Sequence, residues 1–154
     1  MNGAQDQGLA GVSHSPLRQR PGGVTALAIF FAVGATVSLV TIVALLLPGG
    51  VLEPIWRLNP RARAGFATLG AWAPVLLAAV GLGCAAAARG LWSGRRWGRR
   101  LALALLAVNL AGDGANVVLG VEPRALVGIP IAALLLLFLA TARVRAYFRG
   151  GPPC

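Results

Sequence analysis

Three polar residues inside an apolar stretch are the ones best suited to chemistry. Asn109, Asp113 and Asn116 are spaced so that they share one face of a helix. A carboxylate within a bilayer is costly, which makes an intramembrane Asp a candidate functional group. With two amides beside it, Asp113 would suit a protonatable site or a site for a cation or polar solute.

The same three residues would also suit a structural contact. The face could bond the hydroxyls of Thr36, Ser38 or Thr41 in the first apolar segment. Asp113 could instead cap a broken turn, since glycines flank it on both sides, and we predict a local helix break there. We favour a structural role, because one carboxylate without a basic partner at membrane depth is little for a proton relay.

Other reactive side chains form no constellation. His14 is the only histidine and stands in a polar N-terminal segment, while Cys84 and Cys154 fit no metal or disulfide spacing. The sequence has no Ser/His/Asp set, carboxylate pair or phosphate-binding loop. We therefore predict no catalytic residues, no metal and no cofactor, and expect that the protein is not an enzyme.

Composition points to a membrane protein. Apolar residues make up 57% of the 154 residues and charged residues only 12%, about half the usual share in a soluble domain. The net charge is +10, and all its basic residues are Arg. These arginines cluster between apolar runs, where they would contact anionic headgroups of the lipid bilayer, so we expect no nucleic-acid binding.

Four apolar runs approach the length of about 20 residues that spans a bilayer. We predict helices over 24–47, 64–88, 101–121 and 125–142. The predicted fold is all-α: a four-transmembrane-helix bundle running up-down-up-down, within a membrane domain of residues 22–148. Residues 1–21 should form a disordered cytoplasmic tail and residues 149–154 a C-terminal tail.

The arginines predict the orientation. Ten lie in the two tails and in the 89–100 loop, whereas four lie in the other two loops. The positive-inside rule then places both termini in the cytoplasm. Within the 89–100 loop, Arg95, Arg96, Arg99 and Arg100 are candidate contacts for headgroups or an acidic partner, although a role in topology alone explains them as well.

Small residues four apart should let the helices approach closely. They recur in all four segments: Gly34 and Ser38; Ala67 and Ala71; Ala79, Gly83 and Ala87; Ala107, Ala111 and Ala115; Gly128 and Ala132. We expect a tight bundle, with one small-residue face left for a membrane partner or a second copy. The 48–63 loop should lie flat at the outer interface with Trp56 inward and its arginines outward, or else act as a ligand lid.

Three stretches resemble a class of small bacterial four-helix membrane proteins of unknown function. They are GLWSGRRWGRRLALAL (90–105), VGIPIAALLLLFL (127–139) and VRAYF (144–148). The resemblance spans about residues 80–148 and implies a four-helix bundle in a bacterial cytoplasmic membrane. It implies no activity and no catalytic residue.

We therefore expect a multi-pass protein of the bacterial inner membrane that acts as a scaffold or accessory subunit. It would pack against a membrane protein partner or form a homo-oligomer. The alternative is a minimal transporter or sensor that uses the Asn109, Asp113 and Asn116 face.

Overall fold

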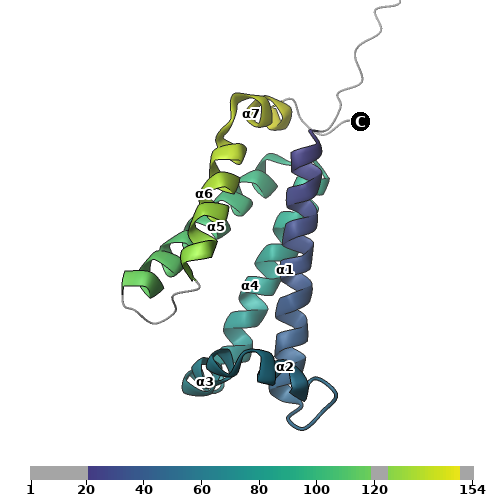
Figure 1. Cartoon of the computed structure of the whole chain (residues 1–154). Helices are drawn as coiled ribbons and strands as arrows, with labels where there is room; N and C mark the ends of the chain where they lie inside the picture. Colours follow the sequence, from purple (N-terminus) through teal and green to yellow (C-terminus); the bar gives the residue numbers. More distant parts are fainter. Residues whose placement is uncertain (1–20, 119–124, 150–154) are drawn as a thin grey trace, which may run out of the picture.

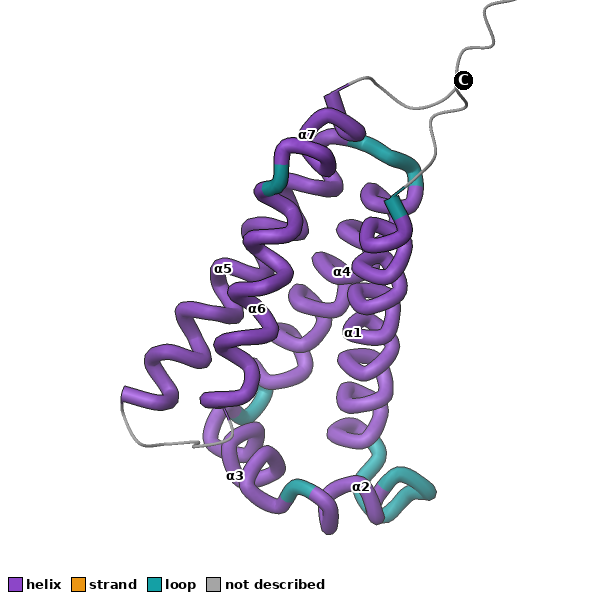
Figure 2. The backbone as a smooth tube through the Cα atoms, turned by 45° about the horizontal axis from the view of Figure 1, so that its top comes forward, coloured by secondary structure: helices purple, strands orange, loops and turns teal. Residues whose placement is uncertain are grey.

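The computed structural model describes residues 21–118 and 125–149, which form helices and no strands. The helices are α1 (Gly22–Leu46), α2 (Glu53–Leu58), α3 (Pro60–Leu69), α4 (Trp72–Trp92), α5 (Arg96–Val118), α6 (Ala125–Ala140) and α7 (Ala142–Arg149). The long helices form two pairs, α1 along α4 and α5 along α6, with α4 also contacting α5 (Figure 1 and Figure 2). The predicted all-α class is confirmed; both predicted tails lie almost wholly outside the described residues.

Three helices are long and apolar enough to cross a membrane, namely α1, α4 and α5. A fourth span is present if α6 and α7, which meet at a bend of 55°, count together. Outward-facing side chains on these helices are apolar, as at Leu82 and Leu134, which are 72% and 66% exposed. Such a surface suits hydrocarbon rather than water, and the chain is a multi-pass membrane protein by this measure.

Two predicted segments have different bounds in the structure. α1 agrees with the predicted 24–47 to within two residues, but the 64–88 helix is wrong: residues 60–69 form α3, and α4 begins only at Trp72. Gly70 causes the interruption, because its φ of +53° ends α3 in a left-handed conformation. At its other end α4 continues to Trp92, because the long side chain of Arg89 reaches the surface from within the helix.

The third and fourth segments also differ from their predicted bounds. α5 begins at Arg96, five residues before the predicted start, and its predicted end at residue 121 lies outside the described residues. α6 ends at Ala140 because Thr141 caps α7: the Thr141 Oγ1 accepts a hydrogen bond from the Val144 amide at 3.4 Å. The cap starts a new helix in a new direction.

The hydrophobic core lies at one end of the molecule, which we call the packed end. It contains residues from the start of α1, the end of α4, the start of α5, the end of α6, and α7. Its members are Val24, Leu27, Ala28, Phe31, Ala87, Leu91, Ala102, Leu106, Leu139, Val144 and Phe148. The last of these come from α7, which turns across this end and closes it (Figure 1).

The packed end is built around a tight turn between α4 and α5. Gly94 has a φ of +62°, and the amides of Gly94 and Arg95 donate to the carbonyls of Leu91 and Gly90 at 3.1 and 2.9 Å. These two bonds form a Schellman motif, the usual glycine-terminated helix end. After the turn, Gly98 lies directly on Gly90: a Cβ added to Gly90 would be 2.5 Å from the Gly98 Cα. Only glycines allow these backbones to touch.

At the opposite end the two pairs of helices diverge (Figure 1). This open end comprises the end of α1, the start of α4, the end of α5 and the start of α6. α2 and α3 lie beneath α1 and α4 there (Figure 2). The described core does not extend to this end, so the helices there are held mainly within each pair.

Candidate functional site

The polar residues of α5 lie on an unbroken helix. α5 runs without interruption through Gly112, Asp113 and Gly114, so the predicted break is wrong. The backbone hydrogen bonds from residue i to residue i−4 continue there, so Asp113 caps no turn. Its side chain forms a hydrogen bond with another side chain. The Asn109 Nδ2 donates to the Asp113 Oδ2 at 3.0 Å. Asn116 is half-buried one turn further on, and no hydrogen bond joins it to either residue in the described structure.

Asp113 faces α6 rather than α1. A Cβ added to Gly128 of α6 would overlap the Asp113 carboxylate, so the absence of a side chain at Gly128 makes room for it. The predicted contact with hydroxyls of α1 is wrong. Thr36, Ser38 and Thr41 each donate to the carbonyl four residues earlier in their own helix, at 3.0, 3.0 and 2.8 Å.

A cleft of about 490 Å³ lies between the two helix pairs. All four long helices contribute to it, with Phe31, Ser38, Cys84, Leu105, Asn109 and Ala132 among its lining residues. Its walls are mostly apolar. Of the three predicted site residues only Asn109 lines the cleft, although Gly128, which the Asp113 carboxylate faces, lines it as well.

The predicted small-residue contacts are realised on some helices only. Gly34 and Ser38 of α1 face α4, where a Cβ on Gly81 would lie 3.0 Å from the Ser38 Cβ. Gly83 faces Leu105 of α5, and Ala87 is fully buried. By contrast, the alanines of α5 are exposed: Ala107, Ala111 and Ala115. That stripe therefore lies on the surface of the bundle.

Two of the four candidate arginines bind backbone at the packed end. The Arg99 Nε donates to the Leu139 carbonyl at 3.0 Å, at the end of α6. Arg96 donates to the carbonyls of Phe148 and Arg149, at the end of α7. Helix C-termini leave carbonyls without partners and carry partial negative charge, so cationic side chains stabilise them. Arg95 and Arg100 are exposed.

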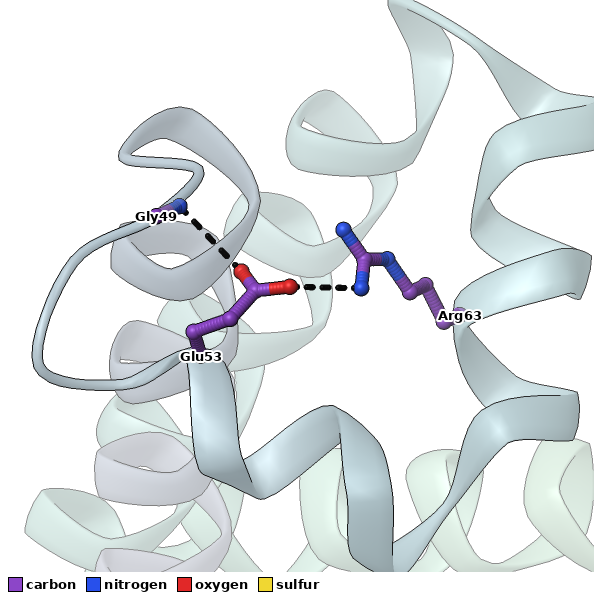
Figure 3. A network of polar contacts seen from close by, with 3 residues as sticks. All are labelled: Gly49, Glu53 and Arg63. Carbon is purple, nitrogen blue, oxygen red and sulfur yellow. Dashed lines mark hydrogen bonds and ion pairs between the residues drawn. The ribbon is translucent and has the colours of Figure 1, made fainter.

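The open end carries the 48–63 segment. The Glu53 carboxylate accepts the Gly49 amide at 3.2 Å and pairs with the Arg63 guanidinium at 2.6 Å (Figure 3). The Gly49 amide and then Arg63 hold the pKa of Glu53 below its usual value. Trp56 is buried against Phe66, with ring centroids 6.1 Å apart, while Arg57 is exposed. Trp56 thus points inward and the arginines outward, as predicted.

Tryptophans mark both ends of α4. Trp72 and Trp92 are 69% and 54% exposed, and the helix between them is about 30 Å long at 1.5 Å per residue. This length equals the thickness of a bilayer hydrocarbon core, and Trp favours its two interfaces. The spacing therefore fits α4 to one membrane crossing.

Sequence reasoning missed the cleft, the Gly90–Gly98 contact and the carbonyl partners of Arg96 and Arg99. The sequence does show a signal for the Gly90–Gly98 contact, because both glycines lie within the predicted 89–100 loop. Among the described residues, no group of three or more His, Cys, Asp or Glu side chains is arranged to hold a metal. No protein-family model matches the chain, and neither a curated protein nor a solved structure matches it.

Proposed function

We propose that the chain is a four-span protein of the bacterial cytoplasmic membrane, running up-down-up-down with both termini in the cytoplasm. The arginine distribution supports this orientation. The packed end carries Arg89, Arg95, Arg100, Arg143 and Arg145 with the two carbonyl-binding arginines, whereas the described open end carries Arg57, Arg61 and Arg63. The positive-inside rule assigns the packed end to the cytoplasm, beside anionic headgroups.

A reporter that is active only outside the cytoplasm tests this orientation. Fused after residue 154, it should stay silent, and fused within the 48–63 segment it should be active. A strong signal from the C-terminal fusion would reverse the orientation.

Within that membrane we propose that the protein is an accessory subunit that binds a transmembrane helix of a partner or of a second copy. The carrying observation is the exposed face of α5, where Ala107, Ala111 and Ala115 follow one another at intervals of four residues. Lipid tails are as apolar as the helices, so no hydrophobic effect drives two helices together in a membrane. They associate instead by close backbone approach at small residues.

Purification in mild detergent with chemical crosslinking tests this function. The wild-type chain should yield a stoichiometric partner or a dimer, and Ala111→Phe should abolish that complex by blocking close approach. Leu134→Phe, on an exposed face of α6, is the matched control and should retain it. A protein that stays alone, or a complex that survives Ala111→Phe, would contradict the proposal.

A second candidate is a minimal transporter or sensor that uses Asp113. The observation in its favour is that Asn109, the hydrogen-bond partner of Asp113, lines the cleft. It ranks second because Asn109, and not Asp113, is among the residues that line the cleft. In sealed vesicles, Asp113→Asn should then abolish a pH-dependent response or solute uptake. An unchanged response from a folded variant would contradict it. We propose no enzymatic activity.

A further inference from the structure

The cleft between the helix pairs has two chemically different halves along its length. Towards the packed end it is walled by apolar side chains, among them Phe31 and Leu106, which belong to the core and close that side. Towards the open end its lining includes the polar residues Ser38 and Asn109 among Val80, Val108 and Gly128. Ser38 lies eight residues from the end of α1, about 12 Å along the helix. The polar side thus faces the nearer membrane surface.

Ser38 offers the cleft an acceptor, and Asn109 offers an acceptor together with one further N–H. The Ser38 hydroxyl already donates its proton to the Gly34 carbonyl, which leaves its oxygen able to accept. The Asn109 Nδ2 donates one hydrogen to the Asp113 Oδ2, which leaves the Asn109 amide oxygen able to accept and its second N–H able to donate. Ser38 is 8% exposed, so little solvent reaches it. A molecule that fills this place satisfies the acceptors only if it carries a donor.

The location decides what kind of molecule can enter. The residues around the cleft mouth include Val108, Ile131 and Phe30, which are 72%, 49% and 49% exposed and so meet lipid. Its volume lies within the range of small-molecule sites, about 300–1,000 Å³. An extended molecule lying in it would have its polar group on the side of the open end, about 12 Å from the end of α1, and its tail deeper in the membrane, towards the packed end.

We propose that the cleft is a binding site for one long-chain alcohol or amide, an alkyl or isoprenoid molecule with a single O–H or N–H donor. The donor bonds the oxygen of Ser38 or that of Asn109, and the alkyl or isoprenoid chain lies against Phe31 and Leu135. The site lies apart from the exposed alanine face of α5, so it does not rest on the proposed accessory function.

A photoactivatable fatty alcohol with a diazirine in mid-chain tests the site, alongside its methyl ether, which lacks the donor. Each probe is added to the full chain in phosphatidylcholine nanodiscs, and labelled positions are mapped by mass spectrometry. The alcohol should label the lining near Cys84, Leu105 and Leu135 saturably. It should bind about fivefold more tightly than the ether, which corresponds to a net hydrogen bond of about 1 kcal/mol.

Two kinds of variant test the contacts of the ligand's hydrocarbon tail and those of its hydrogen-bond donor separately. Ile131→Trp fills the cleft and should abolish saturable labelling by both probes, whereas the control Leu134→Trp points away and should not. Ser38→Ala should lower the affinity of the alcohol about fivefold and leave the ether unchanged. Thermal unfolding of each variant verifies that it is folded.

Three results would overturn the proposal. Labelling scattered evenly over the lipid-facing residues would show that the cleft holds no particular molecule. Saturable labelling that persists in Ile131→Trp would place the probe elsewhere. Equal binding of alcohol and ether would show that the oxygens of Ser38 and Asn109 play no part.

Discussion

At the packed end, α4 and α5 touch through their backbones and arginines bind helix-end carbonyls, whereas at the open end the two helix pairs diverge. Gly90 and Gly98 bring α4 and α5 into contact, and Arg96 and Arg99 hold the ends of α7 and α6. The open end has the Asn109–Asp113 bond and the space beside Gly128. Close packing is thus concentrated at the packed end, and the polar lining of the cleft lies on the side of the open end.

The largest loss of stability is expected at the contact between Gly90 and Gly98. A Cβ on Gly98 would lie 2.5 Å from the Gly90 Cα and 2.7 Å from the Leu91 amide nitrogen, and backbone atoms cannot move aside. Gly98→Ala should therefore cost about 3 kcal/mol, measured as the free energy of unfolding in bicelles. Gly112→Ala, on the same helix with nothing within 4 Å, should instead gain about 0.5 kcal/mol. Equal effects at the two sites would remove the distinction between the ends.

The arginine at the end of α6 should matter next. Arg99→Met removes a charged donor from the Leu139 carbonyl, and we expect a loss of about 1–2 kcal/mol, since the group is partly exposed. Arg100→Met, at an exposed neighbouring position, should change the free energy of unfolding by less than about 0.5 kcal/mol. If both variants behaved alike, the carbonyl bond would contribute nothing.

A double-mutant cycle probes the open end. Gly128→Ala should cost about 1 kcal/mol, because the new methyl group displaces the Asp113 carboxylate, a side chain that can rotate away. Asp113→Ala alone should cost about 0.6 kcal/mol, the usual size of an interhelical polar contact in a membrane. In the Asp113→Ala background, Gly128→Ala should then cost almost nothing. Strict additivity would show that the two residues do not meet.

The smallest effect should come from Glu53. Its pKa is lowered in the folded protein, so its contacts with Gly49 and Arg63 are intact at neutral pH and are lost as the pH falls through that lowered pKa. Amide exchange at Gly49 should accelerate on acidification, while exchange at the packed end stays constant. Glu53→Gln should exchange fast at every pH. A pH-independent rate in the wild-type chain would contradict the assigned contacts.

Sequence reasoning located the apolar spans but not their breaks. α1 was predictable because nothing interrupts its apolar run, whereas the left-handed Gly70 and the Thr141 cap divide runs that hydropathy alone joins. The glycines on either side of Asp113 led to the opposite error, a predicted break where α5 is continuous. A helix tolerates glycine where its backbone hydrogen bonds continue.

The candidate site was predictable in its residues but not in its contacts. Helical periodicity places Asn109 and Asp113 on one face, and the structure confirms their bond. Periodicity says nothing about which neighbour that face meets, so the approach to Gly128 and the cleft beside Asn109 required the three-dimensional arrangement. For the same reason the sequence did not show which small-residue face stays exposed; in the structure, the alanines of α5 are exposed.

Distances between spin labels test the contrast of the two ends most directly. In a chain with Cys84 and Cys154 replaced by Ala, one pair of labels at Gly22 and Ala140 reports on the packed end. A second pair at Leu46 and Val127 reports on the open end. In nanodiscs we predict a narrow distance distribution for the first pair and a longer, broader one for the second. A second pair as short and narrow as the first would mean that the bundle is closed at both ends, which contradicts the account.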